Sequence, residues 1–105
     1  MKDHYDFLIA GAGLYGAVMA RELMDAGYSV LVLEKRSHIG GNAYTREDHG
    51  ILVHQYGAHI FHTASERVWK YANRFAGFNR FTNSPLAFYK GKMYSLPFNM
   101  HTYSQ

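Results

Sequence analysis

Three glycines near the N-terminus have the spacing of a phosphate-binding turn. They are Gly11, Gly13 and Gly16, which follow an apolar run and open a helical pattern. Such glycines allow a tight turn, close approach of the backbone to a pyrophosphate, and close packing of the helix on the strand. Glu34 ends a second apolar run, at about the 20-residue spacing at which an acid accepts hydrogen bonds from ribose hydroxyls. The pattern predicts a dinucleotide site rather than a turn that only joins strand to helix.

A second glycine pair, Gly40 and Gly41, indicates which dinucleotide binds. Two adjacent residues without Cβ let a ligand approach the backbone closely. An extended FAD needs that approach near its phosphates and ribityl chain, whereas a short nicotinamide site has no evident need for it. Lys35 and Arg36 keep a nicotinamide alternative open, because a cation after the acid could accept a 2′-phosphate. The charge of Glu34 opposes a phosphate there, so we expect FAD.

Two histidines further along the chain, His59 and His62, could also do chemistry. A zinc site needs at least three converging ligands, usually with a thiolate or carboxylate among them, and the chain has no cysteine. We therefore expect no metal. Their spacing leaves two interpretations open. They are either surface histidines before a helix, or they hydrogen-bond a flavin and tune its charge near neutral pH.

The hydrophobic pattern predicts the elements that must position these residues. Residues 7–10 and 30–33 are short apolar runs typical of buried strands, and residues 14–26 have the period of an amphipathic helix that Gly27 would end. A helix joining two parallel strands makes a right-handed crossover. We predict an α/β fold with a Rossmann-like βαβ unit over residues 6–34.

The pattern is weaker after the second strand. Residues 37–63 are expected to be mostly loop, with a strand at 51–54. Thr63 and Glu66 have the spacing of a capping box, which predicts a helix from there to about residue 76.

The last third of the chain is rich in aromatic residues. Trp69 and Phe75 lie at helical spacing and are expected in the core. Residues 87–89 and 93–96 flank Lys90-Gly91-Lys92 and predict a β-hairpin.

The composition is that of a globular protein, with 48% hydrophobic and 18% charged residues. A chain of 105 residues is short for a doubly wound fold, and no third parallel strand is evident. We therefore expect residues 1–105 to be one domain, the N-terminal FAD-binding part of a larger flavoprotein. The net charge of +3 comes from scattered Lys and Arg, which does not indicate nucleic acid. No segment has the pattern of a signal peptide or membrane span, so we expect a cytoplasmic protein without membrane insertion.

Five segments resemble UDP-galactopyranose mutases, a family of flavoproteins. They are GAGLYGA (residues 11–17), EKRSHIGGN (34–42), YGAHIFHT (56–63), FTNSP (81–85) and LPFNM (96–100). The first two occur in many FAD proteins, whereas the last three, in this order and spacing, are specific. The resemblance covers nearly the whole chain but only the N-terminal portion of that enzyme.

The resemblance implies an isomerase that interconverts UDP-galactopyranose and UDP-galactofuranose, a nucleotide-sugar step in cell-envelope polysaccharide biosynthesis. Flavin N5 of reduced FAD would attack the anomeric carbon and displace UDP, so the covalent chemistry belongs to the cofactor. UDP-galactose would be the substrate, and the full-length protein would be able to form a homodimer. We expect the 105-residue chain to be inactive by itself.

The resemblance also assigns roles to individual residues. His59 and Ile60 would lie near the flavin ring, His62 would be the catalytic residue facing the isoalloxazine from the substrate side, and Asn83 would contact the substrate. The positions matched to cofactor contacts are Gly11, Gly13, Tyr15, Gly16, Glu34, Lys35, Gly40, Gly41, Asn42, His59 and Ile60.

Two other functions stay open. An FAD-dependent oxidoreductase of the amine-oxidase or desaturase type shares the first two segments, but it leaves His59-Ile60-Phe61-His62 and Asn83-Ser84-Pro85 unexplained. Substrate-dependent oxidation of the flavin would favour it, whereas turnover without net oxidation would favour the mutase. The other alternative is a non-catalytic FAD-binding fragment.

Overall fold

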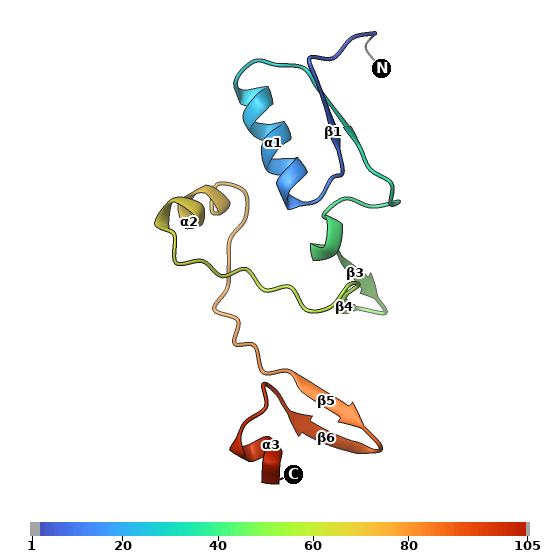
Figure 1. Cartoon of the computed structure of the whole chain (residues 1–105), viewed down its shortest axis with the longest axis vertical. Coiled ribbons are helices and arrows are strands. Elements are labelled where there is room, and N and C mark those ends of the chain that lie inside the picture. Colours follow the sequence, from blue (N-terminus) through green and yellow to red (C-terminus); the bar gives the residue numbers. More distant parts are fainter. Residues whose placement is uncertain (1–2, 105) are drawn as a thin grey trace. The chain divides into compact units, whose positions relative to one another are not determined.

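The structure, a computed structural model, describes residues 3–104 and divides into two compact units, Met1–His59 and Ile60–Gln105. The first unit contains β1 (Phe7–Ala10), α1 (Leu14–Asp25), β2 (Val30–Leu33), the 3₁₀ turn η1 (Gly41–Ala43), β3 (Thr45–Asp48) and β4 (Ile51–His54) (Figure 1). The second unit contains α2 (Glu66–Ala72), β5 (Leu86–Tyr89), β6 (Lys92–Ser95) and α3 (Met100–Ser104).

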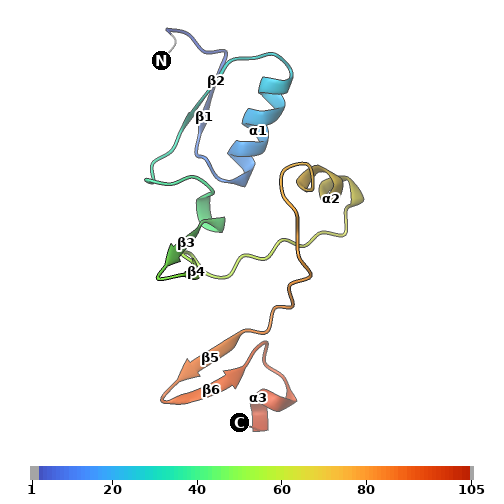
Figure 2. The same cartoon turned by 180° about the vertical axis from the view of Figure 1, so that it is seen from behind.

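The predicted βαβ unit is confirmed. Strand β1 pairs with β2 in parallel, from Phe7 opposite Val30 to Ala10 opposite Leu33. Helix α1 lies alongside this strand pair in both views (Figures 1 and 2). The helix ends one residue earlier than predicted, and Gly27 follows it with φ +91° and donates its N–H to the Met24 carbonyl.

The start of α1 packs closely on the end of β1. Gly16 is the one buried residue among residues 3–104. A Cβ on Gly16 would collide with the Gly11 carbonyl oxygen and lie 3.3 Å from Ile9 Cγ2. Gly11 itself turns the chain out of the strand with φ +99°, a conformation that favours glycine. Both glycines are therefore required by the fold itself.

The opposite end of the strand pair is fixed by Asp6 and Ser29. The Asp6 carboxylate accepts hydrogen bonds from the Ser29 hydroxyl (2.6 Å) and backbone N–H (2.7 Å). The Asp6 N–H donates in return to the Ser29 carbonyl at 3.0 Å. These bonds from Ser29 lower the pKa of Asp6 below its ordinary value.

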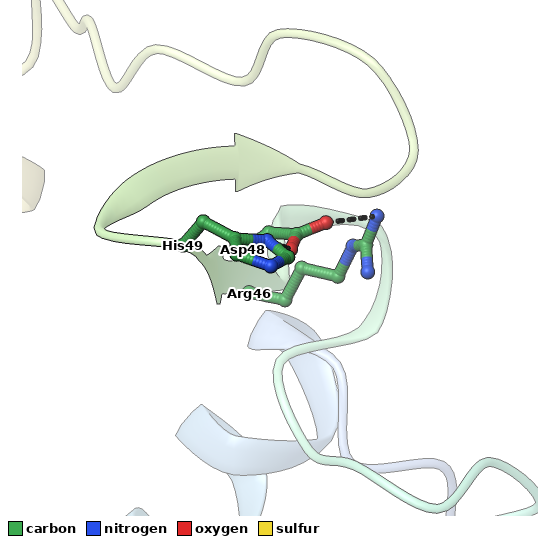
Figure 3. Close-up of polar contacts among 3 residues, drawn as sticks. All are labelled: Arg46, Asp48 and His49. Atoms are coloured by element: carbon green, nitrogen blue, oxygen red, sulfur yellow. Dashed lines mark hydrogen bonds and ion pairs between the residues drawn. The ribbon is translucent and has the colours of Figure 1, made fainter.

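Strands β3 and β4 form an antiparallel hairpin, so the expectation of loop over residues 45–48 is wrong. The turn between them consists of His49 (φ +51°) and Gly50 (φ +78°), as in the two-residue type I′ hairpin turn. The Asp48 carboxylate contacts Arg46 Nη2 at 3.2 Å and His49 Nδ1 at 2.6 Å next to this turn (Figure 3). Strand β3 has no alternation of apolar and polar residues, and it forms because the tight turn at His49 and Gly50 brings it alongside β4. The strand expected at residues 51–54 is confirmed as β4.

In the second unit, α2 is shorter than predicted and begins later. Ser65 is its N-cap and accepts a hydrogen bond from the Val68 N–H at 3.4 Å. Thr63, the predicted cap, accepts instead from the Ser65 N–H at 3.1 Å, just ahead of the helix. The regular helix ends at Ala72 rather than near residue 76. The N–H groups of Arg74 and Phe75 donate to carbonyls three residues earlier in the chain, as in a 3₁₀ turn, instead of four.

The predicted hairpin is present as β5 and β6, joined by a tight turn at Lys90 and Gly91. The helix α3 was not anticipated by the hydrophobic pattern. Asn99 caps it, because its Oδ1 accepts from the N–H groups of His101 (2.9 Å) and Thr102 (3.2 Å).

The expectation of Trp69 and Phe75 in a core is wrong. Trp69 is 44% exposed and Phe75 is 53% exposed. Trp69 instead forms a three-ring cluster with Phe61 and Phe78, with centroids 5.0–6.0 Å apart. Among residues 3–104 no hydrophobic side chain is fully buried. Nor does any helix in that range have the length and apolar character needed to cross a membrane.

Candidate dinucleotide-binding site

The two glycine clusters form one continuous backbone surface in the first unit. The Gly40 N–H donates to the Ala12 carbonyl at 2.8 Å. A Cβ on Gly41 would lie only 2.9 Å from the Cα of Gly13, closer than real Cβ atoms approach. Gly41 therefore lacks a side chain because it contacts the first glycine loop. The predicted reason, close approach of a ligand to Gly41, is not needed to explain this residue.

Gly13 is different, because the protein leaves room for a side chain there. A Cβ on Gly13 would meet only Gly41 Cα, at an ordinary contact distance of 3.8 Å. Its backbone is extended (φ −74°, ψ −179°), which any residue can adopt. The fold itself therefore does not require glycine at position 13, whereas a phosphate approaching the backbone does.

The N-terminus of α1 provides donors for such a phosphate. Gly13 is the N-cap, and no side chain caps the helix. Within residues 3–104, the N–H groups of Leu14, Tyr15 and Gly16 have no acceptor, and the first intrahelical bond is that of the Ala17 N–H to the Gly13 carbonyl at 2.9 Å. Unpaired N–H groups and the partial positive charge of a helix start together favour an anion.

Glu34 follows β2 and connects it to the glycine loop. Its Oε2 accepts from the Ala12 N–H at 2.7 Å and its Oε1 accepts from the Arg36 N–H at 2.9 Å. The backbone N–H of Arg36, followed by that of Ala12, lowers the pKa of Glu34, so the carboxylate is ionised at neutral pH. Each oxygen keeps a further lone pair that can accept a hydrogen bond from a ribose hydroxyl.

A pocket of about 320 Å³ opens between these elements. Two of the predicted cofactor residues, Gly13 and Gly40, line it. Four more lining residues, Leu14, Ala17, Val32 and Ile39, were not predicted to be part of the site, although each is an apolar neighbour of a predicted residue or element. Ala12 completes the lining. An apolar wall beside a phosphate-binding turn suits the adenosine end of a dinucleotide.

The other predicted cofactor residues of the first unit are not among the residues that line this pocket. Arg36 donates to Asn42 Oδ1 at 2.9 Å, and its guanidinium carbon lies 4.2 Å from the centroid of the Tyr56 ring. Tyr15 is 82% exposed on the first turn of α1, and Lys35 is exposed after β2. The structure thus brings the glycines, Glu34 and Asn42 together.

The predicted flavin-ring and substrate residues are not part of that pocket. His59 ends the first unit, and its Nδ1 donates to the Gly57 carbonyl at 2.7 Å. Ile60, His62 and Asn83 belong to the second unit, where the His62 and Asn83 side chains are exposed. No three His, Asp or Glu side chains within residues 3–104 converge in a way that could hold a metal ion.

Comparison with known proteins agrees with this geometry. Residues 9–75 match the family described as NAD(P)-binding Rossmann-like domain. The chain is 44% identical over 105 residues to a probable UDP-galactopyranose mutase of Klebsiella pneumoniae, covering 98% of this chain and 27% of that protein. It is 46% identical over 100 residues to dTDP-fucopyranose mutase of Escherichia coli, covering 93% of this chain and 26% of the relative.

A third relative is the UDP-galactopyranose mutase of Mycoplasma pneumoniae, 44% identical over 81 residues, which covers 75% of this chain and 20% of that protein. The chain therefore spans about a quarter of the length of the curated relatives that it matches. The predicted resemblance is confirmed at this level. The chain belongs to the family of NAD(P)-binding Rossmann-like domains and corresponds to the N-terminal, dinucleotide-binding portion of UDP-galactopyranose mutases.

Proposed function

We propose that this chain is the FAD-binding region of a flavin-dependent nucleotide-sugar mutase. One observation carries the proposal. Gly13 has no Cβ although the fold leaves room for one, and it lies beside unpaired N–H groups at the start of α1. A bound pyrophosphate explains both features. The similarity to mutases then supplies the reaction class.

The charges around β2 support FAD over a 2′-phosphorylated nicotinamide dinucleotide. Glu34 carries a full negative charge where the ribose would lie, and this charge repels a 2′-phosphate. Arg36, one of the two cations that could have accepted that phosphate, is held by Asn42 and the Tyr56 ring. The adenosine ribose of FAD has two free hydroxyls, and Glu34 can accept hydrogen bonds from them.

The residues of this chain would bind and orient rather than react covalently. Reduced FAD would supply the nucleophilic flavin nitrogen for opening and reclosing the sugar ring. The glycine surface would hold the diphosphate, and Glu34 with Lys35 would hold the adenosine ribose. We propose His59 and Ile60 as contacts of the flavin ring, His62 as the catalytic residue on its substrate side, and Asn83 as a substrate contact.

The substrate class is proposed as a nucleoside diphosphate sugar, with UDP-galactopyranose as the first compound to test. One relative carries the name of a dTDP-fucopyranose mutase at similar identity, so the pyrimidine and the sugar C6 group are both open to variation. The residues that discriminate between these two substrates are proposed to lie in the part of the mutases that this chain does not match.

A chimera tests this function. The N-terminal quarter of the Klebsiella pneumoniae relative would be replaced by this chain, loaded with FAD, reduced, and given UDP-galactofuranose or dTDP-fucofuranose. We expect ring isomerisation without net flavin oxidation, and a loss of kcat in His62→Ala with FAD still bound. Flavin oxidation that depends on added substrate would support the oxidoreductase alternative. A chimera that holds FAD but isomerises neither sugar would contradict the proposal.

A further inference from the structure

The loop that carries Gly40 and Gly41 is held from outside by a cluster of side chains. Here the cluster of His38, Tyr44, Tyr56 and Arg36 is called the His38 clasp. Three of its members flank the glycine pair in sequence, and Tyr56 follows β4. None of the four takes part in the lining of the pocket.

His38 is fixed at three points. Its Nδ1 donates to the Ile39 carbonyl at 2.9 Å, so in the neutral ring Nε2 has the free lone pair. The Tyr56 hydroxyl donates to that Nε2 at 2.8 Å. The ring also stacks on Tyr44, with centroids 3.8 Å apart and planes 13° apart. One histidine side chain thus joins the loop to both sides of the β3–β4 hairpin.

The end of the β3–β4 hairpin that contacts His38 is held by backbone pairing. The Gln55 N–H donates to the Tyr44 carbonyl at 3.2 Å, which extends the β3–β4 pairing up to the two tyrosines. Arg36 packs over the Tyr56 ring and bonds Asn42 on the far side of the glycine pair. The His38 clasp therefore contacts the loop both before and after Gly40 and Gly41.

Holding this loop has a direct consequence for ligand binding. Ile39 and Gly40 line the pocket, and the Gly40 N–H bonds the carbonyl of the glycine loop. Ordering a free loop costs backbone entropy at every residue, and a loop that is ordered beforehand avoids that cost on binding. No hydrophobic core among residues 3–104 could order it instead.

We propose that His38 is a positioning residue for the dinucleotide site, and that its bond to the Tyr56 hydroxyl preorganises the Gly40–Gly41 turn for FAD. The inference rests on the proposed function for the identity of the ligand. The ordering of the loop is a property of the chain without ligand, so that part of the inference is independent of the proposed function.

Two tyrosine-to-phenylalanine variants give a matched test. Tyr56→Phe removes the hydroxyl that bonds His38 and keeps the ring under Arg36. Tyr44→Phe removes a hydroxyl for which residues 3–104 provide no hydrogen bond and keeps the stacking on His38. The first readout uses the chain without ligand: amide hydrogen exchange at Gly40 should speed up about threefold to tenfold in Tyr56→Phe, as expected for one lost hydrogen bond, and stay unchanged in Tyr44→Phe.

The second readout is FAD affinity by flavin fluorescence. Tyr56→Phe and His38→Ala should each raise Kd about threefold to tenfold, and the double variant should be no weaker than the worse single one. His38→Gln offers an acceptor to Tyr56 and should recover part of the affinity. Additive effects, equal effects of the two tyrosine variants, or faster exchange throughout α1 would overturn the positioning role. If the chain binds no FAD while Gly40 exchange behaves as expected, the clasp stands and the proposed cofactor fails.

Discussion

Gly13 and Gly41 are in backbone contact, so that a Cβ on Gly41 would lie 2.9 Å from Gly13 Cα. This contact joins the turn after β1 to the turn after β2 and leaves Gly13 facing the pocket. The two glycines therefore have separate roles. Gly41 is required by the contact between the loops, and Gly13 by the ligand that we propose.

Replacing Gly41 tests the first role. Gly41→Ala should push the two loops apart and weaken FAD binding by at least tenfold, because the added Cβ meets backbone rather than a flexible side chain. Gly50→Ala is the matched control, since Gly50 also has a positive φ but its Cβ would meet open space. Equal FAD dissociation constants in the two variants, measured by flavin fluorescence, would show that the loop contact is unimportant.

Replacing Gly13 tests the second role. Gly13→Ala should leave the fold intact, because its Cβ fits at 3.8 Å from Gly41, although alanine is a poorer N-cap than glycine and should cost roughly 0.5–1 kcal/mol at the start of the helix. FAD affinity should fall about tenfold or more in the folded variant, since the methyl group takes the space of a phosphate. Circular dichroism with a parallel FAD titration measures both. Unchanged affinity in a folded variant would remove the argument for a phosphate at this position.

Two carboxylates predict how stability depends on pH. Asp6 and Glu34 both have a pKa lowered by hydrogen bonds in the folded chain. A lowered folded-state pKa stabilises the protein above the pKa of the unfolded chain, and this contribution is lost as the pH falls through the folded value. The free energy of unfolding should therefore be level above about pH 5 and decrease towards pH 3.

Urea unfolding at several pH values, without ligand, measures this dependence. Asp6→Asn and Glu34→Gln should each flatten the acid limb. Glu22→Gln, a change on the exposed side of α1, is the control and should leave it unaltered. An acid limb that is identical in all four proteins would mean that these hydrogen bonds do not form in solution.

The start of α2 predicts unequal effects of two hydroxyl deletions. Ser65→Ala removes the N-cap bond to the Val68 N–H and should cost the helix about 1 kcal/mol. Thr63→Ala removes a bond to the Ser65 N–H ahead of the helix and should cost less. Amide exchange at Trp69, whose N–H donates to the Ser65 carbonyl, reports on this first turn. The opposite order would restore Thr63 as the cap.

The βαβ unit was predictable because its residues obey local rules consistently. Two four-residue apolar runs, an amphipathic helix and a terminating Gly27 all favour the same arrangement, and the strands have the predicted bounds. The acid after β2 was predictable for the same reason. Its two backbone partners could not be predicted, since they depend on how the following loop turns back.

The differences from the expectations have identifiable causes. Strand β3 is Thr-Arg-Glu-Asp, which has no apolar alternation, and it pairs because His49 and Gly50 adopt a tight turn. The cap of α2 was placed two residues early because Thr63 and Ser65 are both suitable hydroxyls. The purpose of Gly41 could not be recognised, because the residue that it contacts lies in another loop.

Titration of the 105-residue chain with FAD, and in parallel with NADP⁺, tests the central claim most directly. Flavin fluorescence and calorimetry should give saturable, one-to-one binding of FAD, weakened in Gly13→Ala and Glu34→Gln, and no binding of NADP⁺. Preference for NADP⁺, or FAD binding that is as strong in both variants as in the unaltered chain, would contradict the assignment of the glycine surface and Glu34 as an FAD site.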